Sequence, residues 1–150
     1  MRFLLLFLVF FQAVLTGCST VPEGGEAGIR EAAVQMYRYQ GLREELIVEP
    51  PTLSSSVVRP GDMIGVELKV TVLSPQETKQ FRVLEVMTLS AADVRIELQR
   101  QESERTQGLH VSTRQVLIPK DLPPGDYTLV ATVAAEDQQV TKRAGFLVRK

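Results

Sequence analysis

Strict alternation of apolar and polar side chains is the feature that most constrains how this chain can fold. In residues 64–72 every second side chain is apolar: Ile64, Val66, Leu68, Val70 and Val72. Because successive side chains of a β-strand point to opposite faces, this rhythm predicts a half-buried strand. Six further segments carry a similar pattern, clearly at 94–98, 127–133 and 144–148, and less regularly at 46–49, 81–88 and 109–118. The sequence therefore predicts seven strands.

Turn residues separate these strands. No segment of helical periodicity lies between them, so crossover helices and a parallel sheet are not expected. The phrase Pro-Gly-Asp occurs twice, at 60–62 and at 124–126, each time directly before a strand. Proline fixes φ at the first turn position and glycine tolerates positive φ at the next. We therefore expect Gly61 and Gly125 to be structural residues.

Residues 46–150 resemble an immunoglobulin-like or fibronectin-III-like sandwich. In such domains the two Pro-Gly-Asp turns would open two strands that face each other from opposite sheets. The stretch 122–129 resembles the start of a tyrosine corner, which implies that the Tyr127 hydroxyl bonds to nearby backbone. The chain has no Trp and cannot form the inter-sheet disulfide, and Pro123 stands where that motif usually has Asp. The resemblance implies an all-β, seven-stranded antiparallel sandwich of immunoglobulin-like architecture.

The amino terminus has the layout of an export signal. A basic start is followed by the apolar run Phe3–Phe11, and the segment ends in Leu15-Thr16-Gly17-Cys18. The apolar stretch is short for spanning a bilayer. The final quartet resembles the lipobox of bacterial lipoproteins, which implies a signal peptide over 1–17 and lipidation of Cys18. An ordinary secretory signal with a chance cysteine is the alternative interpretation. Ser19, where the inner-membrane retention signal usually has Asp, implies the outer membrane, facing the periplasm.

Two short segments connect this terminus to the sandwich. Residues 18–28 carry the lipidated cysteine and a Gly-rich stretch, which predicts a flexible tether. Residues 29–41 have apolar side chains at helical spacing, including Ala33 and Met36, and Gly41 is a suitable stop. This helix either covers part of the domain or docks to a membrane or partner through Tyr37 and Tyr39. Its Ala-rich stripe favours the first interpretation.

Few residues offer chemistry. One Cys and one His cannot form a Cys/His zinc site within the chain, and a net charge of −1 argues against nucleic-acid binding. His110 and Ser112 share a strand face about 7 Å apart, too far for a nucleophile–base pair, so we expect a solvated polar face. The acidic pairs do not follow the alternating pattern of a calcium loop; they are Glu44/Glu45, Glu102/Glu104 and Glu136/Asp137. Polar residues 100–108 predict a mobile hairpin tip, or else a recognition loop.

These observations predict no enzyme, no metal and no cofactor. We expect a non-catalytic, lipid-anchored cell-envelope protein that binds or helps assemble another envelope protein. The first alternative is a periplasmic module that binds a glycan or another ligand. The second is a hydrolase that uses Ser112 and His110, which the strand spacing disfavours.

Overall fold

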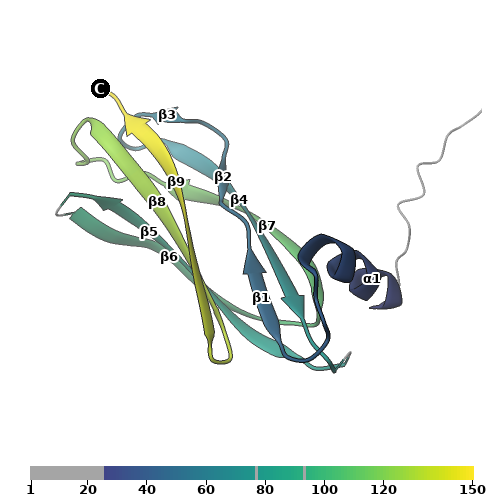
Figure 1. Ribbon diagram of the computed structural model, residues 1–150. Helices are drawn as coiled ribbons and strands as arrows, with labels where there is room; N and C mark the ends of the chain where they lie inside the picture. The colour runs from purple at the N-terminus through teal and green to yellow at the C-terminus, as the bar shows by residue number, and fades with distance from the viewer. Residues whose placement is uncertain (1–25, 77, 93) are drawn as a thin grey trace, which may run out of the picture.

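The computed structural model describes residues 26–76, 78–92 and 94–150. The expected signal peptide, Cys18 and most of the expected tether therefore lie outside the described residues. One helix precedes nine strands (Figure 1). The elements are α1 (Glu26–Tyr37), β1 (Glu45–Val48), β2 (Thr52–Leu53), β3 (Val57–Val58), β4 (Met63–Leu73), β5 (Phe81–Ala91), β6 (Val94–Arg105), β7 (Gly108–Leu117), β8 (Gly125–Ala135) and β9 (Gln138–Val148).

The strands form two sheets that pack face to face. In the four-stranded sheet, β4 pairs with β1, β2 and β7; the five-stranded sheet has the order β3-β9-β8-β5-β6. Every pairing is antiparallel except that of β3 with β9. The prediction of an all-β, immunoglobulin-like sandwich is confirmed, since each of the seven expected segments is a strand. The short strands β2 and β3 are additional.

The two Pro-Gly-Asp phrases precede strands of opposite sheets, β4 and β8, but their glycines differ. Gly61 has φ +88°, and the Asp62 N–H donates to the Arg59 carbonyl at 3.0 Å. Proline followed by a glycine with positive φ makes this a type II turn. Gly125 instead begins β8 with a nearly extended φ of +158°. The same three residues therefore adopt two backbone conformations.

The core is divided into two apolar halves along the strands. One half lies at the end of the sandwich that carries the C-terminus and includes Ile64, Met87, Leu129 and Phe146. The other includes Leu68, Phe81, Val83 and Val133. Glu85 lies on β5 between Val83 and Met87, so a charged side chain separates the two halves.

The prediction of a mobile hairpin tip at 100–108 is wrong. Strand β6 continues to Arg105 and β7 begins at Gly108, so the connection is only two residues long. A register shift opposite Met87/Thr88 leaves Leu98 as the extra residue of a β-bulge. After the bulge the alternation changes phase, and polar side chains such as Ser103 and Arg105 occupy the inward face. Sequence periodicity fails here because the bulge shifts it by one residue.

Helix α1 differs from its prediction at both ends. It begins at Glu26, so residues 26–28 are helical rather than part of the tether, and it ends at Tyr37 because Arg38 has φ +54°. Ala33, Tyr39 and Leu73 form a small buried cluster between the helix region and the outer face of the four-stranded sheet. The Tyr39 hydroxyl donates to the Arg43 carbonyl at 3.0 Å. Tyr39 therefore packs on its own domain and is not exposed for docking.

Candidate functional site

A buried ion triad lies between the sheets. The Glu85 carboxylate on β5 accepts a bond from Arg105 Nη2 at 2.7 Å and one from Arg114 Nη2 at 2.6 Å. The side chains of Glu85, Arg105 and Arg114 are 3 %, 10 % and 13 % exposed. Because Arg105 lies on β6 and Arg114 on β7, this carboxylate joins the edges of the two sheets. The main consequence is structural: the triad fixes where β6 and β7 lie.

The triad turns several polar side chains of β7 toward the interior. Its inward side chains, opposite Val66, Leu68 and Val70 of β4, are Arg114, Ser112 and His110. Its outward side chains include Leu109, Val111 and Leu117, which are 57 %, 53 % and 52 % exposed. The inward face of β7 also carries the buried Val116, and its outward face also carries the polar Thr113 and Gln115. The three exposed apolar side chains are nevertheless an unusual feature of this surface.

His110 and Ser112 are not brought together as a catalytic pair. His110 Nε2 lies 2.8 Å from the Thr106 carbonyl, whereas Ser112 Oγ lies 3.5 Å from both the Leu68 carbonyl and Glu85 Oε2. The expected solvated polar face is wrong for Arg114 and Ser112, because Glu85 binds Arg114 between the sheets and Ser112 lies beside the same carboxylate. His110 is half-exposed, and its hydrogen bond lies at the surface. His110 and Ser112 therefore have different hydrogen-bond partners within the fold.

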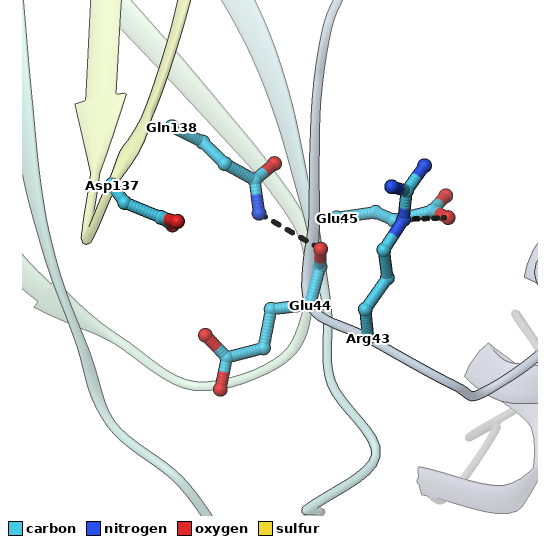
Figure 2. A pocket seen from close by; sticks show the side chains of 5 residues that line it. All are labelled: Arg43, Glu44, Glu45, Asp137 and Gln138. Carbon is cyan, nitrogen blue, oxygen red and sulfur yellow. Dashed lines mark hydrogen bonds and ion pairs between the residues drawn. The ribbon is translucent and has the colours of Figure 1, made fainter.

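A charged depression of about 470 Å³ lies where β1 meets the β8–β9 hairpin. Figure 2 shows its lining, with the Gln138 amide reaching the backbone beside β1. Gln138 donates to the Glu44 carbonyl at 2.8 Å and accepts from the Leu46 N–H at 2.9 Å. Arg43 pairs with Glu45 at 3.7 Å. The two Gln138 hydrogen bonds fasten β1 to the hairpin, so this lining residue serves the fold.

Lys79 neutralises part of this acidic end. Its Nζ lies 2.6 Å from Glu44 Oε1 and 3.8 Å from Glu136 Oε1. The hydrogen bond to Glu44, with the nearby Glu136 charge, holds the pKa of Lys79 above its usual value despite partial desolvation. In the sequence, Glu44/Glu45 and Glu136/Asp137 are two separate acidic pairs. Folding brings them to one end because β1 lies beside the β8–β9 hairpin.

The described residues contain no group of three or more His, Cys, Asp or Glu side chains placed to hold a metal ion. The acidic pair Glu102/Glu104 lies on the outer face of β6, where Glu102 forms an ion pair with Arg82 of β5. The aromatic side chains of the described part are buried or half-buried: Tyr37, Tyr39, Phe81, Tyr127 and Phe146. Across the same residues, no helix has the length and apolar character needed to cross a bilayer.

Tyr127 occupies a structural position at the start of β8. Its hydroxyl donates to the Pro123 carbonyl at 2.9 Å, four residues earlier in the chain. Its ring stacks on Phe146 with centroids 6.1 Å apart. This local bond ties the connection before β8 to the core. The candidate lipidation site Cys18 lies outside the described residues.

Comparisons with known proteins agree with this fold. No protein-family model matches the chain, and no curated protein matches it. Among solved structures, the CARDB domain of a Pyrococcus furiosus protein, in complex with di-metal ions, has a TM-score of 0.53 at 15 % identity. That match covers 72 % of this chain and 90 % of the archaeal domain.

Larger proteins contain similar sandwiches. A β-glucosidase from Listeria innocua matches 71 % of this chain with a TM-score of 0.55 at 12 % identity, but only 16 % of the enzyme is covered. The DNA glycosylase AlkC from Pseudomonas fluorescens matches 83 % of this chain at 13 % identity, with a TM-score of 0.52 and 38 % of that protein covered. The chain thus spans a minor part of these enzymes, and at such identities the likeness shows the fold alone. The fold of this chain is therefore an immunoglobulin-like β-sandwich.

Glu85 does not stand out among the candidate residues in the sequence. The signal was present, because a lone carboxylate interrupts the inward apolar positions of 81–88, and this made the alternation there less regular. A buried carboxylate requires a cationic partner. The partners of Glu85 are Arg105 and Arg114, which lie 20 and 29 residues later in the chain. The partners could not be assigned without the sheet topology.

Proposed function

We propose that this chain is a non-catalytic, lipid-anchored cell-envelope protein whose sandwich binds another envelope protein. The lipobox-like sequence at Cys18 supports the anchor, and Ser19 after it supports the outer membrane with the domain facing the periplasm. The structural observation that carries the binding role is an apolar pair on the outer face of the four-stranded sheet.

That pair consists of Met63 and Leu117. They are direct cross-strand neighbours on β4 and β7, and they are 55 % and 52 % exposed. Their outward side chains would bury apolar area on a partner, which is the main favourable term in most protein association. Strand β7 pairs only with β4 within the described part of the chain, so its other edge is open. An extended segment of a partner could add to this edge and cover Leu117.

Site-specific photo-crosslinking in intact cells tests this proposal. A photoreactive amino acid at Leu117 should give one discrete adduct, and the further substitution Met63→Glu should remove it. The matched control places the same amino acid at exposed Thr141 on β9, which belongs to the other sheet. Equal adducts from both positions, or none from Leu117, would contradict a binding role for this face.

The anchor is tested separately. Labelling with a fatty-acid analogue should mark the wild-type chain, and intact mass should correspond to a chain that begins at an acylated Cys18. A chain cleaved elsewhere and without acyl groups would identify an ordinary secreted protein.

The alternatives have less support. A glycan-binding module uses exposed aromatic rings as stacking platforms, and the rings of the described residues pack in the interior or against the helix. A hydrolase using Ser112 and His110 needs the two side chains to converge, and each has a different partner.

A further inference from the structure

A second apolar surface lies at the opposite end of β7, beside α1. A groove of about 170 Å³ runs between the helix and the outer face of the four-stranded sheet. It is lined by Ala32, Ala33, Met36, Tyr37, Thr71 and Leu109. Val111 continues the surface along β7, since it is two residues from Leu109 on the same face. We call Met36, Leu109, Val111 and this groove the α1–β7 patch.

The α1–β7 patch is left exposed by the fold. Met36, Leu109 and Val111 are 69 %, 57 % and 53 % exposed. Helix α1 covers only the neighbouring part of the sheet, through the buried Ala33. The apolar side of β7 cannot turn inward, because Arg114 on the other side is bonded to Glu85. The patch is therefore a fixed part of the surface.

The position of α1 in the chain indicates what lies next to this patch. Figure 1 shows α1 on the side of the sandwich, away from the end that carries the C-terminus. Glu26, the first residue of α1, follows Cys18 by eight positions. Eight residues span at most about 28 Å even when fully extended. A lipid on Cys18 would thus keep the helix, and the patch beside it, within a few nanometres of the bilayer.

We infer that the α1–β7 patch rests on the surface of the bilayer that holds the Cys18 lipid; this inference depends on the lipid anchor of the proposed function. Apolar side chains on an amphipathic surface insert about 5–10 Å, to the boundary between headgroups and acyl chains. A short tether raises the effective concentration of the patch at the membrane to the millimolar range, so a weak contact is enough to orient the domain.

Basic side chains beside the patch are also compatible with a membrane surface. Lys69 is the β4 neighbour of Val111; its side chain is 41 % exposed and pairs with Glu67 at 3.7 Å. Arg38 follows α1 directly and is exposed. Arg43, five residues later, is also exposed and pairs with Glu45. When the patch contacts the bilayer, basic side chains beside it face the lipid phosphate groups, and anionic lipids attract them. In this orientation Leu117, about 27 Å further along β7, lies away from the membrane and remains open to a protein partner.

The test uses the absence of tryptophan from the chain. Leu109→Trp places a single tryptophan in the patch, and Leu117→Trp places one on the same face of the same strand, at the far end. Excitation at the red edge of the absorption band avoids the tyrosines. Met36→Trp is a second reporter in the patch, from the helix. Each full-length chain is produced in a bacterium that processes lipoproteins, checked by intact mass, and reconstituted into phosphatidylethanolamine–phosphatidylglycerol vesicles with or without brominated acyl chains.

We expect brominated lipids to lower the emission of the tryptophans at 109 and 36 by about twofold, and that at 117 far less, because only the patch reaches acyl chains. Equal quenching at 109 and 117, or none at 109, in an acylated protein would overturn the inference and leave the anchor intact. A blue-shifted but unquenched tryptophan at 109 would show that protein covers the patch, which also overturns it. A chain without acyl groups on Cys18 would contradict the anchor itself and, with it, this inference.

Discussion

The Glu85 carboxylate on β5 and the Arg114 guanidinium on β7 meet across the two sheets at 2.6 Å. Strands β5 and β7 belong to different sheets, so this contact fixes their relative position directly. A slip of β7 by one residue would turn Arg114 outward and leave Glu85 with Arg105 alone. The ion triad therefore specifies the register of β7, and through it the exposure of Leu109, Val111 and Leu117.

Removal of the Glu85 charge should be strongly destabilising. Glu85→Gln keeps the size of the side chain but leaves Arg105 and Arg114 without a counter-charge in a buried position, which costs about 3–5 kcal/mol. The free energy of unfolding from urea denaturation measures this. The matched control is Glu97→Gln, since Glu97 pairs with Arg100 on the outer face of β6 at 2.8 Å, where both side chains are about half exposed. A loss below about 1 kcal/mol for Glu85→Gln would contradict a structural role for the triad.

Loss of the Tyr127 hydroxyl should have a moderate effect. Tyr127→Phe removes the bond to the Pro123 carbonyl and keeps the ring stacked on Phe146. Since the bond is only partly buried and Pro123 is an exposed residue, we expect a loss of about 1 kcal/mol. Thr128→Ala, on the opposite face of β8, should change the free energy of unfolding by less than about 0.5 kcal/mol. If Thr128→Ala were the more damaging variant, the inward assignment of Tyr127 would be wrong.

The ion pair of Lys79 predicts a pH dependence at high pH. The Glu44 hydrogen bond and the Glu136 charge raise the pKa of Lys79 in the folded state, so the pair stabilises the fold below pH 10.5. This contribution should disappear as pH rises through the raised pKa. Urea denaturation of wild type and Lys79→Met should give a constant difference in unfolding free energy near neutral pH, decreasing above pH 10.5. Because the Lys79 Nζ also lies 5.0 Å from the centroid of the Phe81 ring, both of its contacts depend on the charge. A difference that persisted unchanged in strong alkali would therefore show that the charge of Lys79 does not stabilise the fold.

Replacement of Cys18 should abolish the anchor. Cys18→Ser removes the thiol that a diacylglyceryl group would modify, and we expect an uncleaved precursor that takes up no fatty-acid label. Electrophoretic mobility and metabolic labelling measure the two effects. Ser19→Ala serves as the control and should leave both processing and labelling intact. Persistent label on the Cys18→Ser chain would place the lipid elsewhere.

The sequence by itself determined the fold class. Alternation over 64–72 and 127–133 identified β4 and β8, because a strand with one buried face must place apolar side chains at every second position. The same rule located β9 and the first half of β6. Two turn phrases correctly placed the starts of two strands in opposite sheets. These features are local, so they can be recognised in the sequence alone.

Only the tertiary structure decided the polarity of β7 and the end of β6. Alternation says which residues share a face, but it does not say which face is inward when a buried charge competes with apolar side chains. Glu85 resolves this competition through Arg105 and Arg114, both distant in sequence, and the bulge at Leu98 reverses the phase of β6. The exposed apolar surfaces at Leu109 and Leu117 follow from these long-range contacts. They depend on which strands become neighbours, which no local pattern specifies.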